Sequence, residues 1–135
     1  MKMEMPDSPN ISEALRLGKE LGVFGAWPRV LCVCSAAINR SPTLAWVLSH
    51  DPYNFNTISA GSHTYKALMP VTQALLDWAQ RLVFVSSENY KMVLKFGLTL
   101  PQEVYVLNIK DSFSYRDPTL ISIIHEQLAL AKFKR

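Results

Sequence analysis

The sequence predicts an α/β fold: a doubly wound, four-stranded parallel sheet with helices on both faces. Four apolar runs alternate with helix-like stretches along the 135 residues, and they lie at 30–34, 55–60, 82–85 and 104–107. Strand-length apolar runs that alternate with helical patterns are typical of βαβ units. Because the chain is short and 49% apolar, it has room for one hydrophobic core. We therefore expect one α/β domain over residues 28–135, preceded by an extension over residues 1–27.

Four helices are expected between and after these strands. The first is expected to start with Ser41 as its N-cap and Pro42 as its first residue, and to end near His50. The other three are expected over 70–79, 88–96 and 118–133. Gly97 is expected to stop the third of the four helices. In the extension, Asn10 is expected to cap a short helix.

The composition excludes several classes of protein. The net charge is +3, and the basic residues are scattered rather than gathered in a stripe, so we expect no nucleic-acid partner. No run approaches the roughly 18 apolar residues of a membrane span, and no signal peptide is recognisable. The three histidines are widely separated, so we expect neither a metal nor another cofactor. We expect a cytoplasmic protein, away from membranes, with both cysteines reduced.

The segment from Val30 to Pro42 carries the strongest functional signal. Its apolar run ends at Cys34, and Arg40 and Ser41 follow six and seven residues later, where a helix is expected to start. Loop N–H groups and the positive end of a helix favour a thiolate and a bound phosphate alike. Ligands of doubly wound sheets bind outside the carboxyl ends of the strands. The sequence therefore predicts an anion site with Cys34 as nucleophile.

This pattern supplies the groups that hydrolyse a phosphomonoester without a metal. A thiolate attacks phosphorus while positive charge and N–H dipoles hold the equatorial oxygens. Arg40 has the planar fork suited to bidentate phosphate binding. Ser41 can donate its hydroxyl to the thiolate, besides capping the helix. The loop residues that are expected to bind phosphate, mainly through backbone N–H groups, are Ser35, Ala36, Ala37, Ile38 and Asn39. Cys32, one strand period before the nucleophile, is expected to be an inert core residue.

These residues resemble the low-molecular-weight protein tyrosine phosphatases, whose loop has the form Cys-x5-Arg-Ser, usually followed by Pro. The resemblance extends to Ser59-Ala60-Gly61, to Asn89 and to the segment Asn108–Asp111 before the last helix, and covers about residues 29–133. The whole pattern is similar to short predicted tyrosine phosphatases of bacteria and their phages. It implies the phosphotyrosine phosphatase I-like fold and hydrolysis through a cysteinyl-phosphate intermediate on Cys34. The implied substrates are phosphorylated proteins, with phosphotyrosine foremost, or small phosphomonoesters.

The resemblance also implies an aspartate that acts first as general acid and then as general base. Two positions compete for this role. Asp111 lies just past the fourth strand and has no capping duty, so it is favoured. The alternative is Asp117, which precedes Pro118 and whose ordinary role would be the N-cap of the last helix. The rim of the pocket is expected near 35–39, 62–66 and 111–116.

Departures from the family pattern leave other functions open. Ala36 and Ala37 stand where the family commonly has Gly and Asn, so an asparagine that steadies the loop is absent. Asn39 replaces a cysteine that guards the family's nucleophile against oxidation, whereas Ile38 matches members directed at phosphotyrosine. One alternative is therefore a catalytically weak or inactive module that binds phosphate or phosphopeptides. Another is an arsenate reductase, although that chemistry needs relay cysteines beyond the two in the chain.

Overall fold

A computed structural model describes residues 27–134, and its sheet has the predicted parallel arrangement. The strands are β1 (Arg29–Cys34), β2 (Asn56–Gly61), β3 (Arg81–Phe84) and β4 (Glu103–Val106). They follow the order β2-β1-β3-β4, and every neighbouring pair is parallel. The short helix expected near Asn10 lies outside the described residues.

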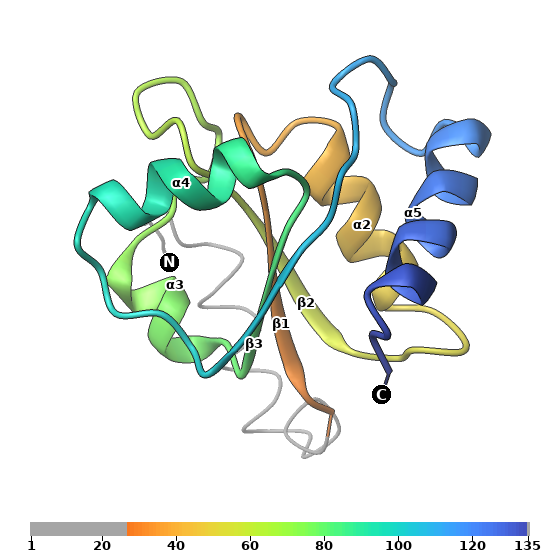
Figure 1. Ribbon diagram of the computed structural model, residues 1–135, viewed down its shortest axis with the longest axis horizontal. Coiled ribbons are helices and arrows are strands. Elements are labelled where there is room, and N and C mark those ends of the chain that lie inside the picture. Colours follow the sequence, from red (N-terminus) through yellow and green to blue (C-terminus); the bar gives the residue numbers. More distant parts are fainter. Residues whose placement is uncertain (1–26, 135) are drawn as a thin grey trace, which may run out of the picture.

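Helices cover both faces of the sheet. They are α2 (Arg40–Leu48), α3 (Gln73–Trp78), α4 (Ser87–Lys95) and α5 (Pro118–Leu130). One layer holds α2 and α5, and the other holds α3 and α4 (Figure 1). Side chains alternate along β1, because Val30, Cys32 and Cys34 pack against α2 and α5, whereas Leu31 and Val33 face the opposite layer. The doubly wound fold is therefore confirmed. No helix among residues 27–134 is long and apolar enough to cross a membrane.

The predicted start of the first helix is wrong. Helix α2 begins at Arg40, with Asn39 at the N-cap position and no side-chain cap bond. Ser41 lies inside the first turn and is fully buried, with its hydroxyl 3.1 Å from the sulfur of Cys34. The physical reason is that the Ser41 hydroxyl contacts the Cys34 sulfur. It therefore does not accept a hydrogen bond from the N–H groups of the first turn. Of the two roles expected for Ser41, the helix cap is therefore excluded.

Helix α3 also begins later than predicted. Its first residue is Gln73, and the Thr72 side chain provides the N-cap. Pro70 cannot belong to this helix because it still pairs with Gly61 in a parallel bridge that extends the sheet. The pairing partner lies outside the local sequence window, so the local pattern did not indicate it.

Two other predicted helix ends are confirmed. Gly97 follows α4 with φ of +70°, a left-handed conformation that glycine adopts without steric cost. The Asp117 side chain accepts a hydrogen bond of 2.8 Å from the Thr119 N–H, and Pro118 is the first residue of α5. Helix α5 ends at Leu130 rather than at 133.

The order of the strands determines where a ligand fits. The chain leaves β1 through α2 to reach β2 on one side, and then crosses through α3 to β3 on the other side. Two neighbouring connections that run in opposite directions leave a crevice at the carboxyl ends of the strands between them. Cys34 is the last residue of β1 and lies at this crevice.

Candidate active site

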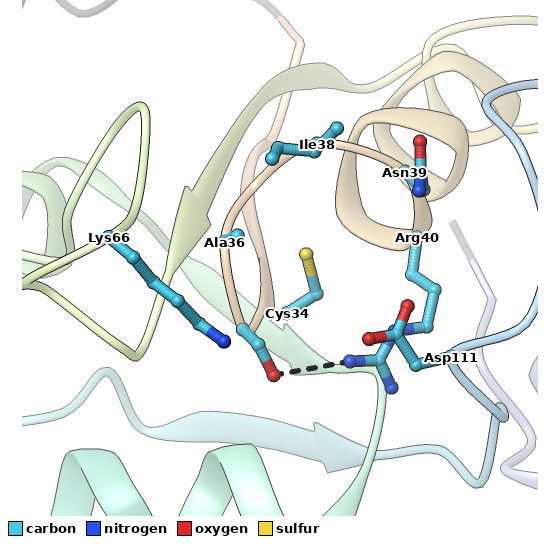
Figure 2. Close-up of a pocket in the computed structure, with 8 residues that line it drawn as sticks. Cys34, Ala36, Ile38, Asn39, Arg40, Lys66 and Asp111 are labelled. Carbon is cyan, nitrogen blue, oxygen red and sulfur yellow. Dashed lines mark hydrogen bonds and ion pairs between the residues drawn. The ribbon is translucent and has the colours of Figure 1, made fainter.

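A pocket of about 110 Å³ lies at the carboxyl end of β1. Three segments that are distant in the sequence form its lining. The loop after β1 contributes Cys34, Ser35, Ala36, Ile38, Asn39 and Arg40. The segment after β2 adds Lys66, and the segment after β4 adds Asp111 (Figure 2). The structure thus brings together most of the predicted site residues and one residue that was not singled out.

The sulfur of Cys34 is buried at the base of this loop and has two polar contacts. It accepts a hydrogen bond of 3.2 Å from the Ala37 N–H and lies 3.1 Å from the Ser41 hydroxyl. That hydroxyl is also 3.4 Å from the carbonyl oxygen of Ala60. The Ser41 hydroxyl can therefore accept a hydrogen bond from a Cys34 thiol while it donates to the carbonyl of Ala60, or it can donate a hydrogen bond to a thiolate.

Cys32 has different surroundings, although it points to the same face of the sheet. It is fully buried among the apolar side chains beneath α2 and α5. This burial raises the pKa of the Cys32 thiol, and the nearby Cys34 raises it further. Cys32 remains a neutral thiol, and its expected place in the core is confirmed.

The Arg40 side chain is buried and held in one orientation. Its Nη1 donates to the carbonyl of Ile109 at 3.0 Å, and its Nη2 donates to the Ser35 hydroxyl at 3.3 Å. Its Nε lies 3.6 Å from Oδ1 of Asp111. Contacts on all three nitrogens fix the plane of the guanidinium group at the wall of the pocket (Figure 2).

Backbone hydrogen bonds hold the loop after β1 against the segment after β2. The donors are the N–H groups of Ser62, His63 and Leu68, and the acceptors are the carbonyls of Cys34, Ser35 and Ala36, at 2.7, 3.0 and 3.1 Å. In a trans peptide the carbonyl and the following N–H point in opposite directions. The next three N–H groups of the loop therefore point away from that segment. One of them, the Ala37 N–H, donates to the Cys34 sulfur. Successive N–H groups arranged in this way form an anion-binding concavity.

Gly61 allows the two segments to come this close. A Cβ atom at this position would lie 2.5 Å from the Cβ of Ala67 and 2.7 Å from the carbonyl oxygen of Ser35. No side chain fits at such distances, so the last residue of β2 has to be glycine. The Ser-Ala-Gly sequence found at the end of the second strand therefore has a steric basis here.

Asn89 connects α4 to the loop through a buried hydrogen-bond network. Its Nδ2 donates to the Ser35 hydroxyl at 3.1 Å and to the Ser62 hydroxyl at 2.9 Å. Its Oδ1 accepts from the Ser86 hydroxyl at 2.7 Å. The loop has no asparagine at its third position after Cys34, but Asn89 supports it from outside.

Sequence comparison alone identifies no relative, because no protein-family model and no curated protein matches the chain. Solved structures do match. A low molecular weight protein tyrosine phosphatase from Streptococcus pyogenes, SP-PTP, has a TM-score of 0.58 at 14% identity, over 76% of this chain and 92% of that chain. Wzb from Vibrio vulnificus, solved in complex with benzylphosphonate, has a TM-score of 0.57 at 17% identity, over 79% of this chain and 99% of that chain. The chain has the fold of the low-molecular-weight protein tyrosine phosphatases.

The same phosphatase fold includes a second class of enzyme. The thioredoxin-dependent arsenate reductase of Corynebacterium glutamicum has a TM-score of 0.56 at 16% identity, over 90% of this chain and 69% of that chain. Likeness at this identity establishes the fold alone. The chemistry therefore has to be argued from the residues in the pocket.

Within the phosphatase fold, the two candidate aspartates occupy different places. Asp111 lines the pocket beside Arg40, and its side chain is 65% exposed. Asp117 caps α5 and is not among the residues that line the pocket. Ala37 and Ser41 are not among the lining residues either, although both contact the Cys34 sulfur. Residues 27–134 hold no group of three His, Cys, Asp or Glu side chains that could bind a metal ion.

Proposed function

We propose that the protein is a metal-independent phosphomonoester hydrolase that acts through a cysteinyl-phosphate intermediate, with phosphotyrosine in proteins as its substrate class. One observation carries the proposal. The Cys34 sulfur accepts a hydrogen bond from the Ala37 N–H of the loop after β1, and it shares one pocket with the fixed guanidinium of Arg40. A nucleophile, an oxyanion site and a bidentate cation at one pocket are what phosphoryl transfer requires.

In the first step, the phosphate oxygens bind the loop N–H groups and the Arg40 fork, and the Cys34 thiolate attacks phosphorus. The S–P bond forms as the bond from phosphorus to the ester oxygen breaks. Asp111, protonated at this stage, gives its proton to the departing oxygen. Its exposure at the rim supports this role because the leaving group departs toward solvent.

In the second step, a water molecule attacks the phosphorus of the cysteinyl phosphate. Asp111, now a carboxylate, takes the proton of that water, and the S–P bond breaks to release inorganic phosphate. The sulfur leaves as a thiolate. The Ser41 hydroxyl at 3.1 Å and the Ala37 N–H at 3.2 Å stabilise that negative charge by donating to it.

An aryl ester is the favoured substrate because of the apolar rim. Ile38 lines the pocket and is half exposed, so it offers apolar surface to a ring above the phosphate. The benzylphosphonate in the Wzb complex likewise carries an aromatic ring next to a phosphorus oxyanion. An arsenate reductase is less well supported, because Cys32 is the only other cysteine and is buried in the core.

The test is release of inorganic phosphate from matched peptides that carry phosphotyrosine, phosphoserine or phosphoarginine, with a metal chelator present. We expect turnover of the phosphotyrosine peptide and of simple aryl phosphates, unchanged by the chelator. Acid quenching during turnover should trap one phosphate on Cys34, detectable by mass spectrometry. Binding of vanadate without any turnover would instead make the protein a phosphate-binding module.

The assignment of the general acid gives a separate prediction. Asp111→Asn should lower kcat by roughly 10²–10⁴-fold for esters with poor leaving groups. Esters whose leaving group departs without a proton should be affected far less. The measurement is kcat for a series of aryl phosphates of increasing leaving-group pKa.

Asp117→Asn is the matched control for this prediction. Asparagine caps helices about as well as aspartate, so turnover and stability should both stay close to wild type. If the leaving-group dependence steepened in Asp117→Asn and not in Asp111→Asn, the general acid would be Asp117.

A further inference from the structure

Lys66 is a charged residue of the pocket for which the proposed mechanism has no use. It lies in the segment after β2 and lines the same pocket as Cys34 and Arg40. Figure 2 shows its amine directed toward the pocket, with Lys66 and Arg40 on opposite sides of Cys34. Among residues 27–134, no carboxylate is within ion-pair distance of this amine. The positive charge is therefore available to a ligand.

The backbone that carries Lys66 is fixed relative to the loop after β1. The Lys66 N–H donates to the carbonyl of His63 at 3.0 Å, which closes a turn. On one side of this turn the His63 N–H binds the carbonyl of Ser35, and on the other side the Leu68 N–H binds the carbonyl of Ala36. Two anchors, one before and one after Lys66, hold its Cα at a constant distance from the anion-binding N–H groups.

The charges at the pocket explain why a second cation would matter. A phosphomonoester dianion and the Cys34 thiolate bring about three negative charges together. Arg40 supplies one positive charge from the wall of the pocket, which leaves the charges around a bound phosphate negative in sum. Repulsion between the nucleophile and its target is reduced by any further cation that touches the phosphate oxygens.

We infer that Lys66 is a second phosphate-binding residue, whose ammonium group donates to a phosphate oxygen on the side opposite Arg40. This inference rests on the proposed function, since it assumes that phosphate occupies the loop. Lysine acts here as a point charge at the end of a flexible stem, whereas Arg40 provides the fixed two-point contact. Lys66 should therefore strengthen binding of every tetrahedral oxyanion, inorganic phosphate and vanadate included.

The test is calorimetric titration of the full chain with inorganic phosphate and with vanadate. Lys66→Met keeps the length of the side chain but removes its charge, and we expect about tenfold weaker binding, as for loss of one charge-assisted hydrogen bond. Lys66→Arg should bind within about twofold of wild type, because it restores the charge. Lys110→Met is the matched control, since Lys110 is exposed, is adjacent to Asp111 in the chain and does not line the pocket. This control should bind like wild type.

Two results would overturn the inference. One is wild-type affinity in Lys66→Met, and the other is equally weak binding in Lys66→Met and Lys66→Arg, which would mean that the charge is not the cause. Because the readout is binding rather than turnover, the inference and the proposed function fail separately. A wild-type protein that binds phosphate but hydrolyses nothing contradicts only the proposed function. Weaker binding in Lys66→Met would still support the role of Lys66.

Discussion

A Cys34→Ser variant is expected to lose at least about 10³-fold in turnover of an aryl phosphate while it keeps its affinity for inorganic phosphate. Serine retains an acceptor for the Ala37 N–H and a partner for Ser41, so the loop keeps its shape. A hydroxyl does not ionise at neutral pH, however, and it is a far weaker nucleophile than a thiolate. In the proposed mechanism, phosphate binding depends on the loop N–H groups and Arg40, which the substitution leaves in place.

The measurements are kcat for an aryl phosphate and the dissociation constant of inorganic phosphate. Cys32→Ser is the matched control, since it makes the same chemical change two residues away on the same face of β1. It should retain turnover and lose about 1–3 kcal/mol of unfolding free energy, because a hydroxyl is poorly satisfied in an apolar core. Turnover by Cys34→Ser at the wild-type rate would exclude this residue as the nucleophile.

A Gly61→Ala variant is expected to lose both stability and phosphate affinity. The new Cβ would lie 2.5 Å from the Cβ of Ala67 and 2.7 Å from the carbonyl oxygen of Ser35, so at least one segment has to move. Overpacking of this kind costs about 1–3 kcal/mol of unfolding free energy. If the loop after β1 moves, the hydrogen bond to the Ser35 carbonyl weakens and the adjacent N–H groups turn away from the anion. We expect roughly tenfold weaker phosphate binding, equivalent to about 1.4 kcal/mol.

Denaturant unfolding and phosphate titration measure the two effects. Gly97→Ala separates them, because a Cβ at Gly97 meets nothing within 4 Å but is strained by the φ of +70°. That variant should lose about 1 kcal/mol of unfolding free energy and no phosphate affinity. If Gly61→Ala binds phosphate as wild type does, close approach of the two segments is not what shapes the anion site.

The two central strands, β1 and β3, were predictable because a buried parallel strand is a continuous apolar run that can be recognised locally. The two helix starts that were wrong depend on contacts with residues outside the helix itself. Ser41 has the composition of an N-cap, but its hydroxyl contacts a sulfur seven residues earlier. Pro70 has the composition of a first helical residue, but it pairs with Gly61. In both cases a tertiary contact overrides a correct local preference.

The candidate site likewise contains residues that the local sequence indicates and residues that only the fold brings to the pocket. Cys34 and Arg40 were predictable, because a strand, a short loop and a helix start determine their relative position within one segment. Asn89 was noticed only as part of a resemblance, since its partners Ser35 and Ser62 lie 54 and 27 residues earlier. Lys66 lies within the rim expected near 62–66, but no local pattern distinguishes it from its neighbours. Only the fold shows that the turn carrying it is hydrogen-bonded to the loop after β1.

The orientation of the peptide planes in the loop after β1 also bears on how far such a sequence can diverge. Recognition by main-chain N–H groups depends on how the carbonyls behind them are anchored, and hardly on the side chains at positions 36 and 37. Mutations can accumulate there while the electric field of the loop stays nearly constant. A chain can then keep this architecture at 14% or 17% identity to solved structures of the same fold while no family model matches it. Surveys for further examples should therefore weigh the strand-to-helix spacing of cysteine and arginine above the composition of the loop.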